Sequence, residues 1–303
     1  MARTLVKGVN RAVYLKQYYQ LCKPNVVALI LFTALVGMLL AVPGVPDPAR
    51  VFWALLGIGL ASASAAAVNH VVDRKIDALM GRTHKRPLPT HALTMGEALG
   101  FALAVGAIAM LILYYLIDPL TALLTFLSLI GYAVVYTMYL KHATPQNIVI
   151  GGAAGAAPPM LGWCAMTGSC DAEALLLFLI IFTWTPPHFW ALAIHREKEY
   201  AKAGVPMLPT THGLAYTRLQ VLLYTILLFL VTLLPYAVGL SGGFYLGGAV
   251  VLGLGFLVYA GQLYRNRLPG IAMKTFGYSI IYLTALFGFL LVDHYLPLLQ
   301  SGS

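Results

Sequence analysis

Three side chains with oxygen ligands, Asn69, Asp73 and Asp77, follow one another at intervals of four residues. If one helix continues through them, all three project from the same face. Two carboxylates at that spacing repel each other, and a divalent cation would remove the repulsion. Oxygen ligands favour Mg²⁺, which is usually held by one or two carboxylates together with substrate phosphates. The alternative is a solvated helix end at which Arg74 and Lys75 pair with the carboxylates.

A basic cluster comes directly after these residues. Arg82, Lys85 and Arg86 stand close together, and Thr83 adds a hydroxyl. Guanidinium and ammonium groups in such a cluster suit a polyanion such as diphosphate. The repeated spacing of the acidic group, followed at once by this cluster, favours a magnesium-diphosphate site over the solvated helix end.

A second polar group leaves an apolar stretch later in the chain. His188 lies seven residues before His195, and Glu199 lies four residues after it, so the three would fall near one helical face. Arg196 and Lys198 lie beside them and are candidates for binding diphosphate. Two such groups meeting across a bundle, with cations between them, would clamp a magnesium-diphosphate. If the substrate is an allylic prenyl diphosphate, loss of diphosphate leaves a carbocation, which apolar and aromatic walls must shield from water.

The elements that must position these residues are membrane helices. Hydrophobic residues make up 60% of the 303 residues and charged residues 10%, and the mean hydropathy is +0.83. This composition excludes a soluble globular enzyme, a nucleic-acid-binding domain and a disordered protein. A helix needs roughly 20 apolar residues to cross a bilayer, and nine stretches qualify: 25–43, 51–71, 97–117, 119–140, 146–167, 173–194, 217–239, 243–262 and 276–296. The sequence predicts an all-α polytopic bundle of about nine transmembrane helices in the lipid bilayer. It forms a single domain over 1–303, with a leader at 1–24 and the bundle at 25–296.

The basic residues predict the orientation of the bundle. With the N-terminus and the loops after even-numbered spans on one side, every lysine and arginine except Arg50 falls on that side. The positive-inside rule makes it the cytoplasmic side, with the C-terminus outside and both polar groups near the cytoplasmic face of a cell inner membrane. The three cysteines cannot build a disulfide framework, and whether Cys164 and Cys170 pair stays open.

The first polar group carries a family resemblance. Asn69, Asp73 and Asp77, with Arg82 and Arg86 after them, resemble the motif of the UbiA-type intramembrane prenyltransferases. Further segments are similar to the protohaem IX farnesyltransferase branch of that superfamily, which forms haem O. These segments are Tyr136-Thr137, Leu140-Lys141, residues 144–152, Gly162-Trp163, residues 187–193, Tyr200 and residues 204–209. The resemblance covers roughly residues 15 to 295.

The resemblance implies a nine-helix fold and a reaction. The branch transfers farnesyl from farnesyl diphosphate to a vinyl group of haem B, and water adds to give a hydroxyethylfarnesyl group. Carried over by residue, Asn69, Asp73 and Asp77 hold Mg²⁺ and diphosphate, and three cations neutralise phosphate charge: Arg82, Arg86 and Lys141. Haem B is thus expected as a substrate and Mg²⁺ as the cofactor.

The resemblance is incomplete at the second group. The superfamily has an Asp pair where this chain has His195 and Glu199. Glu199 is the expected metal ligand there, and His195 is expected to contact phosphate or haem. For His188 two readings have equal weight: a residue that approaches the haem iron or a propionate or assists proton transfer at the vinyl group, and a structural histidine at a helix kink.

Two other functions stay open at this point. One is a sister prenyltransferase that acts on an aromatic acid, a quinone precursor or a chlorophyllide. The other is a transporter or haem-handling membrane protein without chemistry, although a transporter typically places ionisable residues at mid-bilayer. No nucleic-acid partner is expected. A homodimer, and an association with haem A synthase or a terminal oxidase assembly, are open partners.

Overall fold

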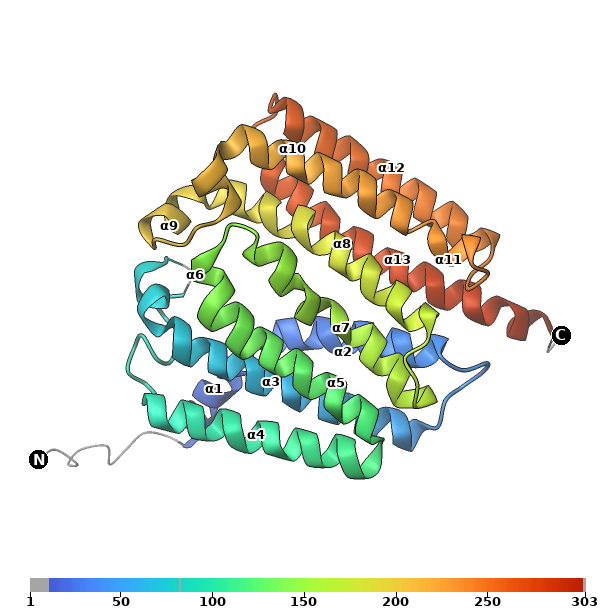
Figure 1. The fold of residues 1–303 in the computed structure, drawn as a ribbon, viewed down its shortest axis with the longest axis horizontal. Coiled ribbons are helices and arrows are strands. Elements are labelled where there is room, and N and C mark those ends of the chain that lie inside the picture. Colours follow the sequence, from blue (N-terminus) through green and yellow to red (C-terminus); the bar gives the residue numbers. More distant parts are fainter. Residues whose placement is uncertain (1–10, 82, 302–303) are drawn as a thin grey trace, which may run out of the picture.

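The computed structural model describes residues 11–81 and 83–301, and every regular element within them is a helix (Figure 1). The helices are α1 (Arg11–Leu21), α2 (Pro24–Leu40), α3 (Pro48–Leu79), α4 (Met95–Leu116), α5 (Pro119–Ile130), the π-helix η1 (Gly131–Leu140), α6 (Lys141–Ala143), α7 (Asn147–Thr167), α8 (Ala172–His195), α9 (Glu197–Lys202), α10 (Leu208–Val231), α11 (Leu234–Ala237), α12 (Gly243–Arg265) and α13 (Ile271–Ser301).

Most of these helices are long and apolar enough to cross a membrane. Within the described residues there are eight such spans, and α1 and α2, bent by 49° at their break, make a ninth if they are counted as one. The predicted all-α polytopic bundle of about nine spans is therefore confirmed. The predicted end of the second span is wrong, because its helix continues to Leu79. Hydropathy marks the apolar part of a helix, and this helix extends through polar residues. Helix α10 begins at Leu208 but is broken at Gly213, where φ is 81°, so its continuous part starts close to the predicted limit at residue 217.

Local capping chemistry fixes where several helices begin. Asp47 accepts hydrogen bonds from two backbone N–H groups of the first turn of α3, which starts at Pro48. Thr94 and Glu97 form a capping box at the start of α4. Asp118 accepts a hydrogen bond from a backbone N–H in the first turn of α5. The carboxylates of Asp47, Glu97 and Asp118 therefore serve in helix capping.

The bundle has two distinct ends. The connection from α3 to α4, α6 and α9 gather at one end, on the left of Figure 1, while α11 and the C-terminal end of α13 lie at the other. The helices that carry both polar groups therefore finish at the same end of the bundle. That this end faces the cytoplasm stays a prediction.

Large aromatic side chains contribute to the largest hydrophobic cluster of the core. Trp184 of α8 packs with Tyr245 and Phe256 of α12 and with Tyr282 and Phe287 of α13 in one buried hydrophobic cluster. The tight packing of α8, α12 and α13 leaves the polar groups at one end as the exception in an apolar interior.

Small residues let α2 and α7 approach closely. A Cβ on Gly162 of α7 would overlap the backbone oxygen of Ala34, and a Cβ on Gly37 of α2 would overlap the backbone oxygen of Pro159. Both obstacles are backbone atoms, which cannot rotate away. Small residues thus permit close helix packing at this contact.

Replacing Gly162 by alanine should therefore destabilise the bundle. We expect Gly162→Ala to lower the free energy of unfolding by about 1–3 kcal/mol, because α2 and α7 must separate to admit the methyl group. Gly155→Ala on the same helix is the matched control, since nothing lies within 4 Å of its Cβ. Denaturation of both variants in detergent measures the difference. Equal stability of the two would contradict the close contact.

Candidate functional site

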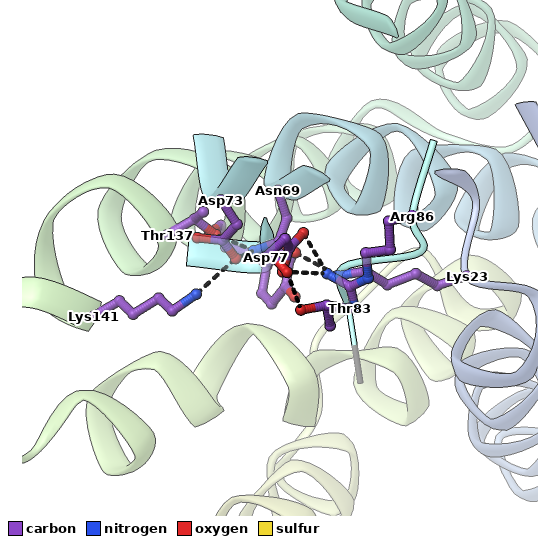
Figure 2. Close-up of polar contacts among 9 residues, drawn as sticks. Lys23, Asn69, Asp73, Asp77, Thr83, Arg86, Thr137 and Lys141 are labelled. Carbon is purple, nitrogen blue, oxygen red and sulfur yellow. Dashed lines mark hydrogen bonds and ion pairs between the residues drawn. The ribbon is translucent and has the colours of Figure 1, made fainter. Parts of the chain in front are cut away.

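The first polar group lies on one buried face of α3. Asn69, Asp73 and Asp77 are 4%, 3% and 3% exposed, although all three are polar. The helix runs without interruption through them, so the predicted shared face is confirmed. The Asn69 side-chain amide donates a hydrogen bond to Asp73 Oδ2 at 2.8 Å (Figure 2). Three oxygen-bearing side chains are thus held together away from solvent.

Cations from two other elements neutralise the two carboxylates. Arg86, in the connection from α3 to α4, donates from Nη1 to both oxygens of Asp77, at 2.9 and 2.7 Å. Lys141, the first residue of α6, donates to Asp73 Oδ2 at 2.6 Å. The structure therefore brings Arg86 and Lys141 to the acidic face, two of the three cations that the resemblance assigns to the phosphates. Arg82, the third, lies outside the described residues.

The connection after α3 folds back on its own helix. The Thr83 hydroxyl donates to the backbone oxygen of Asp77 at 3.0 Å, and Thr83 is 1% exposed. The backbone N–H of Arg86 in turn donates to the Thr83 carbonyl at 3.0 Å. This turn carries the Arg86 side chain onto Asp77. The hydroxyl that seemed suited to a polyanion is used within the fold.

A π-helix places Lys141. The Thr137 hydroxyl, inside η1, donates to the backbone oxygen of Tyr132 at 2.7 Å and accepts from the Asn69 amide at 3.4 Å. Helices with this wider turn are rare and often occur at functional sites. Lys141 follows the last residue of η1 and so points at the acidic face. The sequence predicts the apolar span here but carries no signal for its π-helical half.

Lys23 is a further member of the cluster, which the sequence indicated only as part of the basic leader. It lies in the break between α1 and α2, and its ammonium group donates to the side-chain oxygen of Asn69 (Figure 2). The first group is therefore a cluster of an amide, two carboxylates and three cations from four separate segments.

The oxygen atoms of this cluster suit a hard cation. Asp73 Oδ1 is buried without a hydrogen-bond partner, and the amide oxygen of Asn69 and the carboxylate of Asp77 lie on the same helix face. Within the described residues, no three His, Cys, Asp or Glu side chains gather closely enough to hold a metal ion by themselves. A metal here would complete its shell with water or substrate oxygens, which is the usual manner of Mg²⁺.

The second polar group is split between two helices. Helix α8 ends at His195, and Glu199 belongs to the separate short helix α9. The helical face predicted for these residues holds for His188 and His195 but is wrong for Glu199, because the backbone leaves the helical conformation at Arg196. Arg196 pairs with Glu199 at 3.8 Å, while His195 and Lys198 are exposed.

The two groups approach each other only indirectly. Glu199 pairs with Arg196, and in the part of the chain that the structure describes it forms no ion pair with Arg86 or Lys141 of the acidic face. Tyr136 of η1 nevertheless lies within electrostatic range of both Asp73 and Tyr200, the residue after Glu199. Helix α9 thus stands beside the acidic face while its Glu199 carboxylate is paired with Arg196.

His188 is held in an aromatic stack. Its ring lies between Trp184 at 4.2 Å and Phe276 at 4.5 Å, measured between ring centres. Its Nδ1 is 2.6 Å from the hydroxyl of Ser279, and that hydroxyl donates to the backbone oxygen of Phe276. Ser279 thus occupies the Nδ1 side of the His188 ring. These contacts join α8 to α13.

The amino-acid sequence matches a known family and named relatives over most of the chain. The model of the UbiA prenyltransferase family matches residues 30–291. A protohaem IX farnesyltransferase of Methylococcus capsulatus is 60% identical over 283 residues, 93% of this chain and 95% of the relative. One of Nitrosococcus oceani is 57% identical over 295 residues, 97% of this chain and 98% of the relative.

Solved structures of low sequence identity share the fold. A structure concerning digeranylgeranylglyceryl phosphate synthase in membranes superposes with a TM-score of 0.79 at 18% identity, covering 93% of this chain and 98% of that one. A UbiA homologue from Archaeoglobus fulgidus bound to GPP and Mg²⁺ has a TM-score of 0.62 at 16% identity, with coverage of 90% and 99%.

The pair of Arg86 and Asp77 should couple more strongly than an exposed ion pair. Their side chains are only 19% and 5% exposed, whereas those of Arg196 and Glu199 are 23% and 42% exposed. A double-mutant cycle with Arg86→Gln and Asp77→Asn should give a coupling free energy of unfolding of about 0.5–3 kcal/mol. The matched cycle at Arg196 and Glu199 should give about 0.5 kcal/mol or less.

Unfolding of the single and double variants in detergent supplies both cycles. A coupling at the buried pair no larger than that at the exposed pair would contradict the tight charge neutralisation described for α3.

Proposed function

Because this chain belongs to the UbiA prenyltransferase family and is a prenyltransferase, we propose that it makes haem O. In this proposal it transfers farnesyl from farnesyl diphosphate to a vinyl group of haem B, with addition of water. The observation that carries the diphosphate half is the buried cluster of one amide, two carboxylates and three cations at one end of an apolar bundle. The choice of haem as acceptor rests on the activity for which the close relatives are named.

The proposed reaction is balanced as follows. The allylic carbon–oxygen bond of farnesyl diphosphate breaks, and its electron pair leaves with diphosphate. The vinyl group supplies the electron pair for the new carbon–carbon bond, which moves the positive charge to the carbon beside the porphyrin ring. Water adds to that carbon and loses a proton. The products are haem O, diphosphate and the proton.

The acidic face is proposed to hold the metal and the leaving group. Asn69, Asp73 and Asp77 would bind Mg²⁺, and the unpartnered oxygen of Asp73 supports this assignment. Bound Mg²⁺ would neutralise charge that develops on the departing diphosphate. Arg86 and Lys141 would exchange their carboxylate partners for phosphate oxygens, since charge-assisted hydrogen bonds to phosphate have the same chemistry.

The remaining predicted residues have proposed roles beside this core. Glu199 would serve as an additional metal ligand, and Arg196 and Lys198 would bind diphosphate, as would Arg82. These assignments rest on the position of α9 at the same end of the bundle as the acidic face (Figure 1).

His188 and His195 are the proposed contacts to haem. Because Ser279 occupies Nδ1, Nε2 is the ring nitrogen of His188 proposed to exchange a proton or to approach the iron. The aromatic rings around it would exclude stray water from a carbocation. The active site is proposed to lie near the cytoplasmic face of the inner membrane, where the basic residues concentrate.

A direct assay tests this function. Purified protein in detergent, given Mg²⁺, farnesyl diphosphate and haem B, should convert haem B to a product heavier by one farnesyl group and one water, detected by mass spectrometry. The same mixture with a chelator is the control and should form none. Prenylation of a phenolic acid in place of haem would move the assignment to a sister acceptor. No prenyl transfer to any acceptor would refute the diphosphate half as well.

Removing charge from the acidic face should abolish turnover without unfolding the protein. We expect Asp73→Asn and Asp77→Asn each to lower the rate at least about 100-fold, because each removes charge that would hold the metal ion. Glu199→Gln should have a milder effect, since its carboxylate pairs with Arg196 and not with the cations of that face. Turnover measured beside a melting curve separates catalytic from structural losses. Rates like those of the unaltered protein in both Asp variants would rule out the metal assignment.

A further inference from the structure

We propose that Lys23 is a further cation of the diphosphate site, and that it rests on the Asn69 amide oxygen until metal and diphosphate arrive. This inference deepens the proposed function and rests on its diphosphate half alone. The contact between the Lys23 ammonium group and Asn69 is the observation from which it starts (Figure 2).

The ammonium group of Lys23 lies near Asp73 and Asp77 but hydrogen-bonds to neither carboxylate. Arg86 hydrogen-bonds both oxygens of Asp77, and Lys141 hydrogen-bonds Asp73. Lys23 instead donates to a neutral amide. Among the described residues the cluster thus carries one positive charge more than it has carboxylates. Desolvated charge is costly unless it is compensated, so the cluster is suited to receive an anion.

The backbone directs Lys23 into this position. It occupies the two-residue break between α1 and α2, with φ of 48°, a left-handed conformation that non-glycine residues adopt rarely. Such conformations persist where surrounding structure enforces them, and they cluster at functional sites. Pro24 starts α2 immediately afterwards and restricts the chain on that side.

The helix before the break is anchored on the bundle. Leu21 is fully buried in a cluster with Ala67 and Val71 of α3 and with Ala98 of α4. At the other end of α1, the Tyr14 hydroxyl donates to Glu97 at 2.9 Å. These contacts hold α1 against α3 and α4, so the direction of the Lys23 side chain is set by packing on both sides of the break.

Lys23 competes with a metal ion for one atom. The amide oxygen of Asn69 is both the acceptor for the Lys23 ammonium group and a candidate metal ligand. Two cations cannot share that oxygen closely without repulsion, so Lys23 must leave it when a metal ion binds. The phosphate oxygens that accompany the metal are then the nearest anionic partners for the released ammonium group.

The competition predicts opposite effects on two affinities. In the full-length protein in detergent, Lys23→Met should bind Mn²⁺ alone more tightly, because its competitor is gone. The same variant should bind inorganic diphosphate in the presence of Mg²⁺ about tenfold more weakly, because one charge-assisted hydrogen bond is lost. Electron paramagnetic resonance titration measures the first affinity and isothermal titration calorimetry the second.

Two further variants sharpen the test. Lys23→Arg keeps the positive charge and should retain most of the diphosphate affinity, and it keeps the inference testable if Lys23→Met does not fold. Lys16→Met removes an exposed ammonium group from α1 and should change neither affinity. Diphosphate affinity unaltered in Lys23→Met, joint loss of both affinities, or loss of diphosphate binding in Lys23→Arg would each overturn the role of Lys23.

The test separates this inference from the proposed function. Neither measurement uses haem, so a wrong acceptor leaves the result unaffected. If the unaltered protein bound no diphosphate at all, the proposed function would fail, and the role of Lys23 with it. If the unaltered protein binds diphosphate and Lys23→Met binds it equally well, only the role of Lys23 fails.

Discussion

The burial of two carboxylates at one end of an apolar helix bundle is the constraint on which the site depends. Asp73 and Asp77 are each 3% exposed, and uncompensated charges in such surroundings would destabilise the fold by several kcal/mol. The chain supplies the compensating ion pairs from two segments outside α3. The turn after α3 delivers Arg86 and the π-helix delivers Lys141, while the corner between α1 and α2 adds Lys23, which hydrogen-bonds to Asn69. These local features bring positive charge to the carboxylates of Asp73 and Asp77 on α3.

The same pairs prepare the site for a charged substrate. Cations held on carboxylates by short hydrogen bonds are already desolvated and oriented, so a phosphate group can take over these partners with little reorganisation. The surplus positive charge makes the cluster receptive to an anion, while the unpartnered oxygen of Asp73 makes it receptive to a metal. An empty polar pocket would fill with water instead. The same ion pairs thus stabilise the fold when no substrate is bound and supply the cations that would bind the substrate phosphates.

Local patterns in the sequence predict part of this arrangement. The four-residue spacing predicts the shared face of Asn69, Asp73 and Asp77 because helical periodicity alone determines it, and runs of apolar residues predict the spans. The rest depends on contacts between segments far apart in the chain. Nothing in the leader distinguishes Lys23 from other basic residues, and the break after His195 interrupts a periodicity that the residue types support. Such features follow from tertiary packing, which a local pattern does not contain.

The central claim is that the acidic face of α3 binds a metal ion together with a diphosphate. The most direct measurement is pulsed electron-nuclear double resonance on the protein with Mn²⁺ and a non-hydrolysable farnesyl thiodiphosphate. Coupling of the Mn²⁺ electron spin to ³¹P should appear, and it should vanish when Asp73 and Asp77 are both changed to asparagine. Coupling that persists in that double variant, or its absence in the unaltered protein, would contradict the claim.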